Sequence, residues 1–100
     1  MTTYTVDWTN TATDDVYKFG DYVAQHSSLR EGEDLVNRLF KAGDTLAWSP
    51  QRYAPAPEWG EGVRRMPLLG RRILFKVEEA EHVVRILAVV GGRENPRSVR

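Results

Sequence analysis

The sequence predicts an α+β domain with one strand, a helical hairpin and then three consecutive strands (β-α-α-β-β-β). An alternating stretch at residues 4–8 opens the chain, two amphipathic helical stripes follow it, and the last third alternates as strands separated by turns. One hundred residues with 41% apolar content can build one hydrophobic core. We therefore expect a single domain, residues 1–100, with both helices on one face of a mainly antiparallel sheet.

The N-terminal third indicates a strand followed by a helix. Tyr4, Val6 and Trp8 alternate with polar residues, which is the pattern of a half-buried strand. The polar residues 9–11 include candidates for the cap of the next helix. An apolar helical stripe then runs to residues 26–27, formed by Ala12, Val16, Phe19 and Val23.

A second helix is predicted between residues 28 and 50, where Pro50 ends it. Gly20 and Gly43 weaken the two helices by about 1 kcal/mol each relative to alanine, but they would let helices approach closely. Residues 49–60 hold three prolines and two aromatic residues, which favours a stiff loop. The stripe of the second helix consists of Leu35, Leu39, Ala42 and Leu46.

Three strands are predicted at residues 63–68, 71–79 and 82–92. Pro67 lacks a backbone donor and suggests an edge or the end of a strand. The last stretch is apolar on both faces, as expected of a central strand covered on both sides. Residues 91–100 are predicted to form a flexible C-terminal tail.

Cations within these strands predict a mixed basic and apolar groove. If Ile73, Phe75 and Val77 face the helices, the alternating side chains lie on the opposite, open face. Exposed apolar surface rimmed by charge is typical of a partner site. The alternative is that the charges are solvated and pair with the nearby Glu78, Glu79 and Glu81. The expected groove consists of Arg64 or Arg65, Arg72, Leu74, Lys76, Arg85, Leu87 and Val89.

Composition and motifs favour binding over metal or cofactor chemistry. The 14 basic and 14 acidic residues balance, which argues against strong non-specific attraction to nucleic acid. The chain has no cysteine, and His26 and His82 follow no metal or triad spacing, so we expect no metal and no cofactor. The N-terminus lacks a signal-peptide pattern, and the longest apolar run, 86–90, is too short to cross a membrane. We therefore expect a cytoplasmic protein.

The order of elements, with the stretch GVRRMPLLGRRILFKVEEAEHVVRILAVVGGRENP, resembles the RelE/ParE superfamily of toxins from bacterial toxin–antitoxin modules. VDWTNTATDDVYKFGDYVAQHS is similar to the first strand and helix of the family, and LAWSPQRY to its helix end and proline turn. The resemblance implies a toxin neutralised by a co-encoded antitoxin whose C-terminal segment wraps it. The groove is then the expected antitoxin-binding surface, and a toxin–antitoxin hetero-oligomer is expected.

The superfamily contains two activities: RelE-type toxins cut messenger RNA in the ribosome, and ParE-type toxins inhibit DNA gyrase. Arg72 and Arg93 match basic residues of the nuclease pattern, and Arg65 stands where a lysine is usual. The final segment, ENPRSVR, lacks the Tyr or His that nucleases supply, and this chain is neutral where RelE-type toxins are basic. Both departures favour the ParE type.

The sequence and the resemblance leave three candidate functions. The first is a ParE-like toxin that binds gyrase without chemistry of its own, with the tail residues Arg93, Arg97 and Arg100 as candidates for toxicity. The second is a ribosome-dependent endoribonuclease that uses Arg65, Arg72 and Arg93. The third is an inactive homologue that only binds its antitoxin.

Overall fold

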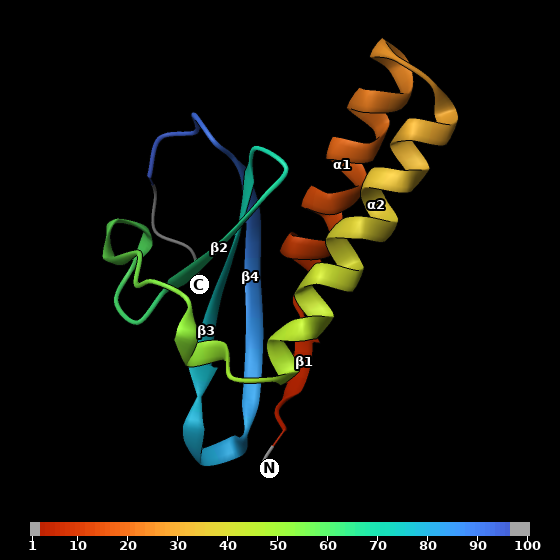
Figure 1. Ribbon diagram of the computed structural model, residues 1–100. Coiled ribbons are helices and arrows are strands. Elements are labelled where there is room, and N and C mark those ends of the chain that lie inside the picture. The colour runs from red at the N-terminus through yellow and green to blue at the C-terminus, as the bar shows by residue number, and fades with distance from the viewer. Residues whose placement is uncertain (1–2, 97–100) are drawn as a thin grey trace.

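The computed structural model describes residues 3–96, and its elements follow the predicted order (Figure 1). Two helices follow the first strand, and three further strands complete the chain, which confirms the α+β prediction. Short 3₁₀ turns occupy residues 45–47, 50–52, 57–59 and 79–81. The main elements are β1 (Thr5–Trp8), α1 (Asn10–His26), α2 (Leu29–Asp44), β2 (Arg64–Leu68), β3 (Arg71–Glu78) and β4 (Val83–Gly91).

The four strands form one mixed sheet in the order β1-β4-β3-β2. β1 pairs with β4 in parallel, because the helical hairpin carries the chain across the sheet between them. The three C-terminal strands form the predicted antiparallel meander, with β3 between β2 and β4. β4 is therefore an inner strand, as its apolar sequence predicted.

Polar caps delimit the two helices near the predicted positions. Thr9 precedes α1, and its Oγ1 accepts a hydrogen bond from the Ala12 amide at 3.2 Å. Ser28 precedes α2 and accepts in the same way from the Glu31 amide at 3.1 Å. The prediction that Pro50 ends α2 was wrong, because the helix ends at Asp44 and tightens into a 3₁₀ turn.

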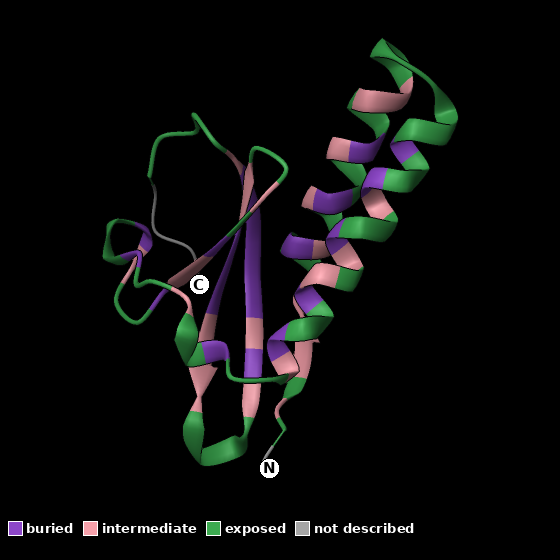
Figure 2. Cartoon of the chain, in the orientation of Figure 1, coloured by how far each residue is buried: buried purple, intermediate pink, exposed green. Residues whose placement is uncertain are grey.

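The main core lies between the helical hairpin and one face of the sheet. Ile73 and Phe75 of β3 are fully buried there, so the face predicted to meet the helices does so. Val84 and Ile86 of β4 lie in the same cluster. Buried residues follow β4 and the sheet-facing sides of both helices, whereas the outer sides of the helices are exposed (Figure 2).

Glycines let α1 and α2 pack closely. A Cβ on Gly32 would lie 2.5 Å from the carbonyl oxygen of Gly20 and 2.9 Å from the Ala24 Cβ. Gly43 instead accommodates the Trp8 ring, because a Cβ there would lie 2.1 Å from Trp8 Cζ2. The prediction that glycine lets the helices approach closely is therefore confirmed for Gly20. For Gly43 it is wrong, because this glycine makes room for the Trp8 ring of β1.

Arg85 joins three strands through ion pairs. Its Nη1 pairs with Asp7 of β1, and its Nη2 and Nε bind the two carboxylate oxygens of Glu78 at 2.8 and 3.3 Å. The hydrogen bond from Arg85 holds the pKa of the Glu78 carboxyl below its usual value of 4.5. These groups are about one-third to one-half exposed, so solvent screens the pair.

Substituting Gly32→Ala should destabilise the hairpin although alanine is the better helix former. The added methyl group meets backbone and another methyl group, neither of which can rotate away, so the helices must separate. We expect the free energy of unfolding to fall by roughly 1–3 kcal/mol, as for other overpacked interiors. Urea unfolding measures this, with the exposed α2 substitution Asn37→Ala as the control that should change stability by less than about 0.5 kcal/mol.

Substituting Arg85→Gln should reduce the dependence of stability on acidic pH. The lowered pKa of Glu78 contributes stability that is present above pH 4.5 and is lost as the pH falls through the folded-state pKa. The variant should be less stable at neutral pH, and its free energy of unfolding should fall less on acidification. Urea unfolding across this pH range checks the slope, with Arg52→Gln as a control; parallel curves for the variant and the parent would contradict the assignment.

Candidate functional site

The sheet face opposite the helices is covered by the loop between α2 and β2. Arg72, Leu74 and Lys76 do belong to this face, but the loop lies against it on the side away from the hairpin (Figure 1). Leu74 and Leu87 are only 0% and 4% exposed, so the prediction that they line an open groove was wrong. The cluster that seals this face consists of Ala56, Trp59, Val63, Leu74, Leu87, Ala88 and Val90.

Val89 was also placed on the wrong face. Leu74 pairs with Ala88, but the next residue, Phe75, pairs with Ile86, so Leu87 is an extra residue in β4. Such a β-bulge shifts the alternation of side chains by one position. Val89 consequently joins the helix-side core instead of the predicted groove.

The register of β2 separates its two arginines. Arg64 pairs with Phe75 and therefore lies on the helix-side face, where its Nη1 donates to the Tyr53 carbonyl at 2.7 Å. This placement contradicts its expected groove position. Arg65 pairs with Leu74 and lies on the loop-covered face, where its Nη1 donates to the Pro55 carbonyl at 3.0 Å.

Arg85 and Lys76 are neighbours on paired strands but differ in their contacts. Hydrogen bonding to Glu78 raises the pKa of Arg85, so Arg85 stays charged while Glu78 and Asp7 neutralise it. For Arg85, therefore, the alternative prediction is correct: the cation pairs with nearby acidic residues and does not line an open groove. Lys76 is half-buried, and its side chain makes no hydrogen bond or ion pair within residues 3–96.

Arg72 contacts the segment that follows β4. Its guanidinium lies over the Trp59 ring, 5.4 Å from the ring centroid. Its Nη2 donates weakly to the carbonyls of Gly91, Gly92 and Glu94 at 3.4–3.5 Å. Arg72 is therefore joined to both the loop and the C-terminal segment.

The predicted tail begins within β4, since that strand extends to Gly91. Gly92 donates to the Gly70 carbonyl at 2.9 Å, and the exposed Arg93 follows it. The flexibility of residues 91–100 stays a prediction. The other two tail cations, Arg97 and Arg100, lie outside the described residues.

The two histidines lie outside the strands that carry Arg65 and Arg72. His26 ends α1, where its Nδ1 contacts the Tyr22 carbonyl at 2.8 Å. His82 precedes β4 and lies beside Tyr4, with ring centroids 5.4 Å apart. Arg72 pairs with Val90 near the other end of β4, so the length of the strand separates it from His82.

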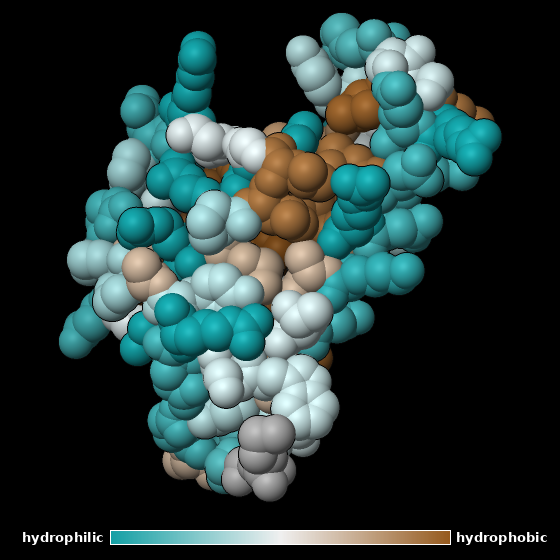
Figure 3. All heavy atoms as spheres, in the orientation of Figure 1, coloured by the Kyte–Doolittle hydropathy of each residue, from teal (hydrophilic) through white to brown (hydrophobic). Residues whose placement is uncertain are grey.

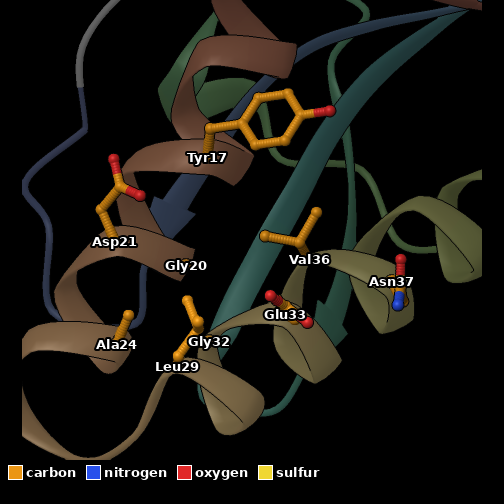
Figure 4. A pocket seen from close by; sticks show the side chains of 9 residues that line it. All are labelled: Tyr17, Gly20, Asp21, Ala24, Leu29, Gly32, Glu33, Val36 and Asn37. Atoms are coloured by element: carbon orange, nitrogen blue, oxygen red, sulfur yellow. The ribbon is translucent and has the colours of Figure 1, made fainter.

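Sequence reasoning missed a groove along the helical hairpin (Figure 4). Gly20 and Gly32 form its narrow base, and the exposed Tyr17 and Leu29 flank it, being 52% and 68% exposed. The sequence feature that could have revealed this groove is the placement of apolar residues at helical spacing from the glycines. The charged residues that line the groove, Asp21 and Glu33, are both acidic.

Apolar side chains also gather where the hairpin meets the sheet (Figure 3). Leu69, in the turn between β2 and β3, is 48% exposed and lines a hollow opposite Leu35 of α2. Charged residues of α2 flank this hollow: Glu31, Asp34 and Arg38.

Two further features bear on function. Within residues 3–96, no three carboxylate or imidazole side chains gather as metal ligands would. None of the described helices is both long and apolar enough to span a bilayer.

Three solved structures show where this fold is found. The ParDE toxin–antitoxin system of P. aeruginosa matches with a TM-score of 0.77 and 19% identity, over 89% of this chain and 96% of that one. The RelBE2 complex of Mycobacterium tuberculosis matches with a TM-score of 0.66 and 24% identity, over 91% and 93%. The isolated E. coli RelE toxin matches with a TM-score of 0.60 and 20% identity, over 92% and 87%. At these identities the likeness shows the fold alone.

Sequence comparison identifies the family more directly. No curated protein matches the chain in sequence. The family model described as the ParE toxin of the type II toxin–antitoxin system parDE does match, over residues 6–96. Because this match spans nearly the whole chain, the chain belongs to the ParE toxin family of type II toxin–antitoxin systems.

Proposed function

We propose that this chain is a toxin that inhibits DNA gyrase by binding it, and that a co-encoded antitoxin neutralises it. Membership of the ParE toxin family supports the proposal. One observation favours gyrase over the ribosome as the target. Arg72, which a nuclease would use to contact phosphate, already binds other parts of this chain. Its guanidinium is held by Trp59 and by carbonyls of the chain's own C-terminal segment.

Binding without chemistry also agrees with the side chains around Arg72. RNA cleavage through the 2′-hydroxyl needs a base and an acid, and arginine is a poor base because it hardly deprotonates. His82 precedes β4, at the opposite end of that strand from Val90, the partner of Arg72, and His26 ends α1. An action on gyrase would place the protein in the cytoplasm.

A ribosome-dependent endoribonuclease is the second candidate. One observation favours it: Arg65 and Arg72 lie on the same face of adjacent strands, and Arg93 follows directly on a residue that Arg72 contacts. Such a group of cations could stabilise charge on a scissile phosphate. The Arg65 and Arg72 side chains would first have to leave their present carbonyl partners.

The proposed antitoxin has exposed apolar surface to cover. The hairpin groove beside Tyr17 and Leu29 and the hollow beside Leu69 are each suited to apolar side chains of a helix or strand. Two of the structures matched above are named as toxin–antitoxin systems or complexes, which supports a hetero-oligomer here. The buried Leu74 and Leu87 could contact an antitoxin only if the loop moved.

The purified chain should inhibit DNA supercoiling by purified gyrase and should leave messenger RNA intact in a translating extract. Addition of the antitoxin encoded beside its gene should restore supercoiling, which is the matched control for non-specific inhibition. Cleaved messages with unaffected supercoiling would instead support the nuclease, and Arg72→Ala should then abolish cleavage. Antitoxin binding without either activity would identify an inactive homologue.

A further inference from the structure

The segment that follows β4 is fastened to the body of the protein at two points. The first is Arg72, whose Nη2 lies among the carbonyl oxygens of Gly91, Gly92 and Glu94. The second is a backbone hydrogen bond from the Gly92 amide to the Gly70 carbonyl, 2.9 Å long. We call these two contacts the C-terminal clasp.

Only glycine fits at position 92, because the backbone there passes close to the backbone of Gly70. A Cβ on Gly92 would lie 2.7 Å from the Gly70 carbonyl oxygen and 3.6 Å from its carbon. A Cβ on the preceding Gly91 would meet no atom within 4 Å. The turn that presents the Gly70 carbonyl is itself tight, with positive φ angles of 50° at Leu69 and 76° at Gly70.

Arg72 connects the segment to the apolar cluster under the loop. Trp59, on which the guanidinium rests, is fully buried in that cluster and is therefore a fixed support. A planar guanidinium can stack on a ring while its edge donates to carbonyls, which a flexible polar chain does less well. The three carbonyls are thus gathered around one cation whose position the core determines.

Arg93 lies between two residues that the clasp holds. Arg72 contacts the carbonyls of Gly92 and Glu94, and the side chain of Arg93 is exposed. Ordering a cationic segment before it meets a target reduces the entropy lost on binding. Arg93 therefore lies in a stretch of backbone that Arg72 contacts on both sides.

We propose that Arg72 is a positioning residue that acts on toxicity through the C-terminal segment, by presenting Arg93 to the target. This inference rests on the proposed function, because it takes gyrase as the target. It assigns Arg72 neither to catalysis nor to phosphate binding. It predicts that loosening the clasp weakens inhibition of gyrase while the fold and antitoxin binding are retained.

The test compares Arg72→Ala and Arg72→Lys with the parent chain. Arg72→Ala should accelerate hydrogen exchange at the Gly92 amide and raise the concentration needed to inhibit supercoiling, each by about tenfold. Arg72→Lys should recover only part of both losses, because the ammonium keeps a cation beside Trp59 but lacks the planar edge that donates to the carbonyls while the face stacks on the ring. The affinity for the antitoxin should change less than about threefold in either variant.

Arg52→Ala is the matched control for the lost cation. Arg52 also lies over a ring, 4.9 Å from the Tyr53 centroid, and donates to the Trp48 carbonyl, but it does not touch the clasp. Arg52→Ala should leave both hydrogen exchange at the Gly92 amide and gyrase inhibition unchanged.

Gly92→Ala breaks the clasp without removing charge and should weaken inhibition as Arg72→Ala does. Gly91→Ala is its control for exchange, and the Gly92 amide should stay protected in it.

The outcomes separate this inference from the proposed function. If the parent inhibits gyrase and Arg72→Ala inhibits it equally while Gly92 exchanges faster, positioning by Arg72 is overturned and the function stands. Unchanged Gly92 exchange in Arg72→Ala would overturn the clasp itself. If the parent leaves supercoiling unaffected, the proposed function fails, and the link from Arg72 to toxicity fails with it, whatever the exchange measurement shows.

Discussion

The burial of β4 on both faces is the constraint on which the rest of the structure depends. On one face Val84, Ile86 and Val89 pack against the helical hairpin, and on the other Leu87 and its neighbours pack beneath Trp59 and Val63. Each buried side chain of this size contributes about 1.5–3 kcal/mol relative to exposure. The helices and the loop therefore both depend on this one strand, and the bulge at Leu87 sets which residues meet which layer.

The covering loop determines what the cations on the sheet can do. Because Trp59 and Val63 close the apolar centre of that face, Arg65 and Arg72 lie at its margins, where they donate to backbone carbonyls of the loop and of the C-terminal segment. A guanidinium that donates to these carbonyls holds segments of its own chain together, and it would have to leave them to contact another molecule. The exposed apolar surface lies elsewhere, along the hairpin and beside Leu69. The exposed apolar surface and the engaged arginines therefore lie on different parts of the molecule.

Much of the architecture could be predicted because it depends on local patterns. The alternation around Ile73 and Phe75 placed β3 correctly against the helices, and the polar residues 9–11 included the cap of the first helix. The positions of Val89 and Arg64 could not be read in this way. A bulge depends on how two strands fit together, and a register depends on pairing between distant residues, so neither leaves a periodic signal in one strand.

The sequence by itself determined the order of elements, the helix-facing side of β3 and membership of the toxin family, because periodicity, caps and family patterns are properties of neighbouring residues. Only the tertiary structure decided that the loop between α2 and β2 seals the opposite face and that Arg72 joins Trp59 to the C-terminal segment. Proline and aromatic residues predicted a stiff loop, but its destination depends on which apolar surface remains for it to bury. That surface exists only once β3 and β4 have paired and one of their faces is already occupied by the helices.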